Sequence, residues 1–93
     1  MYVILVYDIA EEENGTRRQR NIFKICKKYL IHIQNSVFEG DTNPSHLARM
    51  KKELMPWIDK NLDSVIIFKS REERWLTKEF YGKDESDVTS NFL

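Results

Sequence analysis

The chain has 93 residues, a formal net charge of zero, 41% hydrophobic residues and a single cysteine, Cys26. This length predicts one domain, near the size at which a single core is only just adequate, so association into a homodimer is expected. The composition excludes a disordered chain and a globally basic nucleic-acid binder, and the lone cysteine excludes an intramolecular disulfide and a multi-cysteine metal site.

The first strand and the first helix follow from local pattern. A buried strand is expected over residues 1–8, which are apolar up to Asp8 and rich in β-branched and aromatic types. After a polar loop, Thr16 and Gln19 have the spacing of a capping box, which predicts a helix over residues 16–30. One side of that helix carries an apolar stripe of Ile22, Cys26, Tyr29 and Leu30.

The middle of the chain has a β-like composition without clean alternation over residues 32–40, because Val37 and Phe38 are adjacent and would face opposite ways. A bulge or a tight turn near Asn35 and Ser36 would explain this pattern, and the residues alone do not decide between them.

A second helix is expected to open with Asn43 as N-cap and Pro44 at the first helical position. Pro56 should kink this helix or begin a separate final turn. The buried stripe of the helix is expected to comprise Leu47, Met50, Leu54, Trp57 and Ile58.

The remaining elements complete a fold prediction. Residues 63–70 are expected to form another buried strand, and residues 75–81 a strand with mixed alternation. The order of elements predicts an α+β, ferredoxin-like domain over residues 1–82, with two helices on one face of a mostly antiparallel sheet. Residues 83–93 read as a polar linker and an apolar edge strand that docks on its own sheet or on a partner's. The uncovered sheet face again favours a dimer.

The N-terminal apolar run does not resemble a secretory signal, because no basic region precedes it and it ends at Asp8. No segment approaches the roughly 20 apolar residues that cross a bilayer. We therefore expect a cytoplasmic protein with no membrane segment.

Asp8 is the first candidate for chemistry, because it is a charge at the end of an apolar strand. As a cap, it would accept backbone N–H bonds from the following turn, and pattern alone favours this interpretation. As a metal ligand it would be weak alone, but two copies meeting across a dimer axis would make a credible Mg²⁺ site for hydrolysing a phosphodiester. Glu39 and Asp41 are further candidate ligands, whereas His32 and His46 lack any ligand spacing.

The first helix also carries a run of basic residues with no acid among them, namely Arg17, Arg18, Arg20, Lys24, Lys27 and Lys28. A solvated helix surface is the ordinary explanation for such a run. A phosphate backbone responds to the local field rather than to the net charge, so the run also predicts nucleic-acid binding. No glycine-rich phosphate loop, paired-histidine metal motif or nucleophilic serine in a glycine elbow accompanies it.

Several local patterns combine in a chain of this length. Asp8 lies within YDI at the end of the first strand, Arg17 and Arg18 open the first helix, and QNSVFEG and DSVIIF follow at residues 34–40 and 63–68. Together they resemble the CRISPR-associated Cas2 family over nearly the whole chain.

The resemblance implies a ferredoxin-like homodimer whose C-terminal strand packs on the partner subunit, with Asp8 and its symmetry mate binding Mg²⁺ or Mn²⁺. It implies an endonuclease acting on RNA or double-stranded DNA in spacer acquisition and antiviral defence, or a bridge between DNA and a larger CRISPR integrase subunit. Two functions stay open. In one, Asp8 is catalytic and Arg17 or Arg18 neutralises the phosphate; in the other, the protein is a DNA-binding scaffold without hydrolysis.

Overall fold

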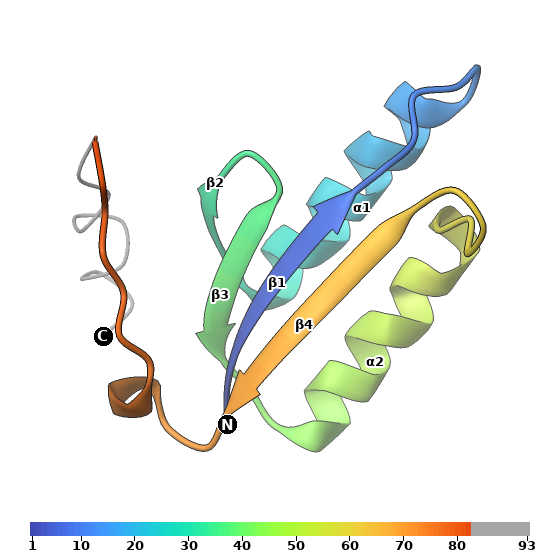
Figure 1. Ribbon diagram of the computed structural model, residues 1–93. Helices are drawn as coiled ribbons and strands as arrows, with labels where there is room; N and C mark the ends of the chain where they lie inside the picture. Colours follow the sequence, from blue (N-terminus) through green and yellow to red (C-terminus); the bar gives the residue numbers. More distant parts are fainter. Residues whose placement is uncertain (83–93) are drawn as a thin grey trace.

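A computed structural model describes residues 1–82 of the chain. Within them, strands and helices follow one another as Figure 1 shows, with short 3-10 helices at Met55–Trp57 and Glu73–Trp75. The main elements are β1 (Tyr2–Asp8), α1 (Gly15–Tyr29), β2 (Ile31–Gln34), β3 (Val37–Asp41), α2 (Pro44–Leu54) and β4 (Ser64–Ser70).

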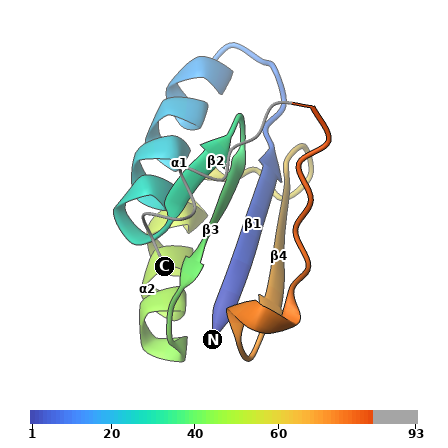
Figure 2. The ribbon, with the colours of Figure 1, turned by 90° about the vertical axis from the view of Figure 1, so that its left-hand side faces the viewer.

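The strands form one antiparallel sheet in the order β2-β3-β1-β4. Both helices cover the same face of this sheet, as the side view in Figure 2 shows. This is the ferredoxin-like arrangement, so the predicted α+β fold class is confirmed. None of the helices in residues 1–82 has the length and apolar character needed to span a membrane.

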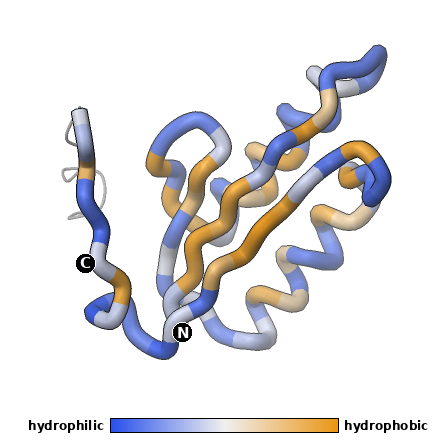
Figure 3. The backbone as a smooth tube through the Cα atoms, in the orientation of Figure 1, coloured by the Kyte–Doolittle hydropathy of each residue, from blue (hydrophilic) through white to orange (hydrophobic). Residues whose placement is uncertain are grey.

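The core lies between the helices and the central strand β1. Side chains alternate along a strand, so Val3, Leu5 and Tyr7 all reach the helix-covered face and are buried there. The register places Leu5 between Phe38 of β3 and Ile67 of β4. Figure 3 shows the resulting concentration of hydrophobic residues along β1 and β4. The helices contribute Ile22, Cys26, Leu30, Leu47, Met50 and Leu54 to the same cluster.

The other face of the sheet is only partly covered, and we call four of its apolar side chains, on β1 and β4, the open-face stripe. They pair in register as Ile4 with Phe68 and Val6 with Ile66. Ile66 is 48% exposed and Phe68 is 53% exposed. The prediction of a buried strand at residues 63–70 is therefore wrong for this face of β4, because no helix covers it.

The first helix begins one residue earlier than predicted, at Gly15, with Asn14 as N-cap and no side-chain cap hydrogen bond. The expected capping box of Thr16 and Gln19 is wrong, because Thr16 already lies inside the first helical turn. A Cβ atom on Gly15 would lie 2.8 Å from the Ala10 carbonyl oxygen, so only glycine permits this close approach to the preceding loop.

The two alternatives for the middle of the chain both occur. A tight turn at Asn35 and Ser36 joins β2 to β3, and the pairing shifts register between His32 and Gln34. Asn35 has a φ of 39°, a left-handed conformation that asparagine tolerates better than most residues.

The predicted second helix is confirmed at its start and ends in the second of the two ways considered. Asn43 caps α2 by accepting a hydrogen bond from His46 N at 2.8 Å. Pro56 lies in a separate 3-10 turn that follows the helix, rather than in a kink.

The strand expected over residues 75–81 is wrong. A 3-10 helix ends at Trp75, and the chain beyond it to Gly82 joins no ladder of the described sheet. Figure 2 shows this segment lying beside the sheet on the side away from the helices, where it joins neither edge strand. The linker and edge strand predicted for residues 83–93 lie outside the described residues.

Candidate functional site

Asp8 is the last residue of β1, and it is exposed. The register places it opposite Ser64, the first residue of β4. Its carboxylate forms no hydrogen bond or ion pair with any other residue in the range 1–82. Asp8 therefore does not cap the turn that follows β1, which is the structural role that the sequence pattern favoured.

Asp63 performs that capping role. Its Oδ1 accepts a hydrogen bond from Ala10 N at 2.8 Å, and its Oδ2 accepts one from Asp59 N at 2.7 Å. Its side chain is fully buried and forms an ion pair with Arg18. Burial by itself raises the pKa of Asp63, but the hydrogen bonds from Arg18 and the two backbone amides prevail and hold that pKa below its ordinary value of 3.8.

Arg18 is used inside the fold. Its side chain is only 12% exposed, its Nη2 lies 3.1 Å from Glu12 Oε1, and its Nη1 donates to the Trp57 carbonyl oxygen at 3.2 Å. Together with the bond to Asp63, these contacts tie the β1–α1 loop to the segment before β4. The charge of Arg18 therefore already has partners within the fold, and little of its side chain is left to contact the predicted phosphate.

The remaining basic side chains of α1 are exposed, as predicted. Lys28 is nevertheless paired, with its Nζ 2.6 Å from Glu53 Oε1 on α2. The other four form no ion pair with described residues, and we call them the basic surface of α1. They are Arg17, Arg20, Lys24 and Lys27.

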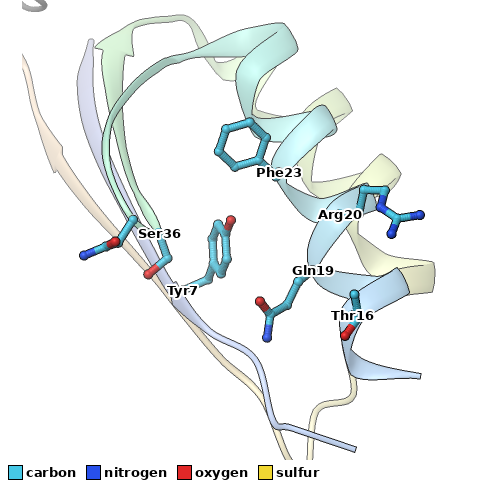
Figure 4. Close-up of a pocket in the computed structure, with 7 residues that line it drawn as sticks. Tyr7, Thr16, Gln19, Arg20, Phe23 and Ser36 are labelled. Carbon is cyan, nitrogen blue, oxygen red and sulfur yellow. The ribbon is translucent and has the colours of Figure 1, made fainter. Parts of the chain in front are cut away.

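Two clefts adjoin one another near the end of β1, between this strand, α1 and the β2–β3 turn. The Asp8 cleft has a volume of about 350 Å³ and is lined by Tyr7, Asp8, Ile9, Ala10, Glu11, Gln19 and Ser36. The second, the helix–hairpin cleft, lies between α1 and the β2–β3 turn and has a volume of about 490 Å³. Its lining residues, shown in Figure 4, are Tyr7, Thr16, Gln19, Arg20, Phe23, Asn35 and Ser36. Because three of these residues line both clefts, the two form one continuous depression.

The metal-ligand candidates do not come together in one chain. Within residues 1–82, no group of three histidine, cysteine or acidic side chains is placed to hold an ion. Glu39 is buried, accepts a hydrogen bond from Tyr2 Oη at 2.8 Å, and pairs with Lys78. Asp41 lies 3.2 Å from the N-terminal ammonium group. Both acids pair with the first half of β1, whereas Asp8 ends that strand, so they do not join Asp8 in a site.

Three site residues escaped the sequence analysis as functional candidates. The sequence pattern places Asp63 at the start of a strand and inside the DSVIIF segment, but it does not reveal the partner Arg18, which is 45 positions away. Gln19 was interpreted as a cap, and Tyr7 only as part of a buried strand. Tyr7 and Ser36 do fall inside the YDI and QNSVFEG segments, so the family patterns marked these places without saying what the side chains do there.

Comparison with known proteins gives a consistent result. A family model described as CRISPR associated protein Cas2 matches residues 1–78. The chain is 56% identical over 93 residues to a CRISPR-associated endoribonuclease Cas2 of Fusobacterium nucleatum, covering 100% of this chain and 87% of the relative. A Moorella thermoacetica protein with the same description is 44% identical over 92 residues, with 98% and 100% coverage. The crystal structure of Streptococcus pyogenes Cas2 matches with a TM-score of 0.71 and 30% identity, covering 86% of this chain and 100% of that one.

Proposed function

The chain belongs to the CRISPR-associated Cas2 family, and we propose that it is a metal-dependent endonuclease that cleaves RNA as a homodimer in CRISPR defence. Asp8 from each subunit would be the catalytic and metal-binding residue. The basic surface of α1 would hold the phosphate backbone. RNA is the proposed substrate because the relatives of highest identity considered above are described as endoribonucleases.

The observation that carries this proposal is the free carboxylate of Asp8. Of two aspartates at the same end of the sheet, Asp63 has backbone and side-chain donors, whereas Asp8 is exposed beside a cleft with no donor from residues 1–82. A polar group that the fold does not use, at the mouth of a cleft, is available to a ligand.

The Mg²⁺ of this proposal would be shared by two chains. Two exposed acids of one chain, Asp8 and Glu11, line the Asp8 cleft, and residues 1–82 place no group of three histidine, cysteine or acidic side chains to hold an ion. Mg²⁺ in proteins is commonly bound by one or two carboxylates together with waters and substrate phosphates, so a second copy of Asp8 would strengthen the site. The open-face stripe supports a dimer, because Ile66 and Phe68 leave large apolar surfaces in water that a second copy would cover. When bound, the ion would supply Lewis-acid charge at the reacting phosphate.

The chain's own residues would act around that ion. Asp8 would fix its position at the end of β1. Asp63 holds the loop after Asp8 through Ala10 N, so the strand end keeps one conformation. Arg17 and Arg20, exposed and without acidic partners in residues 1–82, would neutralise phosphates that flank the reacting one.

A cleavage assay on single-stranded RNA tests the proposal. It compares the wild type with Asp8→Asn and Asp41→Asn, each with Mg²⁺ and with a chelator. Asp41 is an exposed aspartate at the end of β3 and therefore a matched control. We expect Asp8→Asn to lower the turnover number roughly 100-fold or more, a loss typical of one catalytic group, and Asp41→Asn to leave it unchanged. Equal activity of wild type and Asp8→Asn would refute the assignment.

The basic surface of α1 favours a second candidate function, a scaffold that binds duplex DNA and a larger CRISPR integrase subunit without hydrolysis. Residues 83–93, the predicted docking strand, would contribute to that contact or to the dimer. Co-purification with the integrase subunit, followed by an integration assay with Asp8→Asn, separates the two functions. Full integration by this variant would assign the cellular role to the scaffold. The cytoplasmic location stays a prediction.

DNA binding by the scaffold can be tested with two matched triple variants. In the first variant, glutamine replaces Arg20, Lys24 and Lys27. The magnitude of the slope of log affinity against log salt concentration should fall by about 0.9 for each lost phosphate contact. Arg49, Lys51 and Lys52 are exposed on α2 and carry the same three charges, so their change to glutamine is the control. Equal slopes for the two triple variants would exclude the basic surface of α1 as the DNA contact.

A further inference from the structure

The helix–hairpin cleft collects polar side chains that the fold does not use. Within residues 1–82, none of their side-chain groups takes part in a hydrogen bond or an ion pair, although all line one depression. They are Thr16, Gln19, Arg20, Asn35 and Ser36. Figure 4 shows Tyr7 at the centre of the cleft, Ser36 on one side and the α1 residues on the other. A concave site that combines apolar surface with a few polar groups is a candidate binding site.

The walls of this cleft are held in place. The ring of Phe23 packs edge-on against His32 at 4.8 Å and Phe38 at 5.3 Å between centroids. A hydrogen bond of 2.8 Å joins His32 Nε2 to the carbonyl oxygen of Asn35, and Tyr7 N donates to the carbonyl oxygen of Ser36 at 3.2 Å. The β2–β3 turn and the aromatic floor are therefore preorganised, which lowers the entropy cost of binding.

The cleft combines the three chemistries that recognise an unpaired nucleotide. Phe23, which is half-buried, offers aromatic surface on which a base can stack, and the buried Tyr7 lines the cleft beside it. Gln19 and Asn35 offer amides, which can donate to and accept from a base edge. Arg20 lies on α1 at the rim, with its guanidinium extending away from Tyr7 in Figure 4, where it can meet a phosphate. No acidic residue lines this cleft.

Size and position agree with such a ligand. The volume of about 490 Å³ falls within the range of roughly 300–1,000 Å³ that is typical of small-molecule sites. Tyr7, Gln19 and Ser36 line this cleft and the Asp8 cleft alike. A nucleotide in the helix–hairpin cleft would therefore lie directly next to a phosphodiester at Asp8.

We propose that the helix–hairpin cleft binds one unpaired base of a single-stranded RNA, next to the phosphodiester that Asp8 addresses. This inference rests on the proposed nuclease function for the place of the reacting phosphate, but base binding itself does not require cleavage. It makes Gln19 a specificity-determining residue and Arg20 a rim contact to the adjoining phosphate. A duplex would be excluded from the cleft, because its bases are stacked and paired and do not enter a pocket of this kind.

The test measures binding without cleavage, in a protein that carries Asp8→Asn throughout. Fluorescence anisotropy gives the affinity for short single-stranded RNAs that differ at one base, and for a duplex of the same length. Gln19→Ala removes the amide and places a strong helix former in α1, so folding is preserved. The control is Asn61→Ala, which removes an exposed amide that lies outside both clefts.

We expect Gln19→Ala to weaken single-stranded RNA binding by about tenfold for the preferred base and to flatten the differences among bases, as the loss of one or two hydrogen bonds predicts. Duplex binding should not change, and Asn61→Ala should match the parent. Arg20→Gln should weaken all single-stranded RNAs alike, relative to Arg49→Gln on α2. The inference is overturned if Gln19→Ala weakens duplex binding equally, or if it changes neither the affinity nor the base preference.

The wild-type background keeps this test separate from the nuclease proposal. There, Gln19→Ala should raise KM and leave kcat unchanged, because its contact is made equally in the ground state and the transition state. If Asp8→Asn proves to be as active as the wild type, the nuclease assignment fails. The anisotropy measurements would then still test base binding by themselves.

Discussion

Two carboxylates at the same end of the sheet have opposite surroundings. Asp63 lies just before β4, is fully buried, and has Arg18, Ala10 N and Asp59 N as donors. Asp8 ends β1 one register step away, is exposed, and has no partner in residues 1–82. The fold therefore depends on Asp63, whereas Asp8 is available to a ligand. A buried charge is kept only when it is paired, whereas a free charge at a cleft costs the fold little.

Removal of the Asp63 carboxylate should have the largest effect on stability. Asp63→Ala should lower the free energy of unfolding by roughly 3 kcal/mol, because it removes the buried ion-pair partner of Arg18, leaves Glu12 as its remaining acidic partner, and deprives Ala10 N and Asp59 N of their acceptor. Urea denaturation measures this change, with Asp41→Ala as the control for an exposed acid. A loss of stability no greater than that of the control would contradict the role given to Asp63.

Acid should weaken the same contact. The native pKa of Asp63 lies below its ordinary value of 3.8, so the unfolded chain binds protons more readily in this range. The stability that the ionised carboxylate provides is fully present above that ordinary value, and it is lost as the pH falls through the native pKa. The stability difference between wild type and Asp63→Asn should therefore shrink as the pH is lowered below about 4. A difference that is independent of pH from 7 to 2 would show that ionisation of Asp63 does not stabilise the fold.

Asp8 should give the smallest change in stability. Asp8→Asn should alter the free energy of unfolding by no more than about 0.5 kcal/mol, because the side chain is exposed and holds no contact within residues 1–82. Thermal and urea unfolding, both without divalent metal, check this. A loss comparable to that of Asp63→Ala would mean that Asp8 has a structural partner after all.

Sequence patterns within single segments predicted the strands and helices whose formation depends on neighbouring residues. Continuous apolar residues identified β1, and helical spacing placed Ile22 and Cys26 on the buried side of α1. The helix start was misplaced because Asn14 and Thr16 are both good N-cap residues, and the close approach of Gly15 to Ala10 is a tertiary fact.

Contacts between residues far apart in the chain could not be predicted from the sequence. The pairing of Arg18 with Asp63 joins residues 45 positions apart, so a run of basic residues looked uniform although one of its members is buried. The strand expected after β4 does not form within residues 1–82, because Lys78 pairs with the buried Glu39 and holds that segment away from the edges of the sheet. The helix–hairpin cleft arises only when α1 packs beside the β2–β3 turn, and no single segment reveals it.

Metal stoichiometry tests the central claim, that Asp8 is free for a metal shared by two chains. Titration of Mn²⁺ into the protein, followed by electron paramagnetic resonance, counts bound ions without reliance on activity. We expect one strongly bound Mn²⁺ for every two chains of the wild type. This ion should be lost in Asp8→Asn and retained in Asp41→Asn. One ion per chain, or binding that survives Asp8→Asn unchanged, would contradict it.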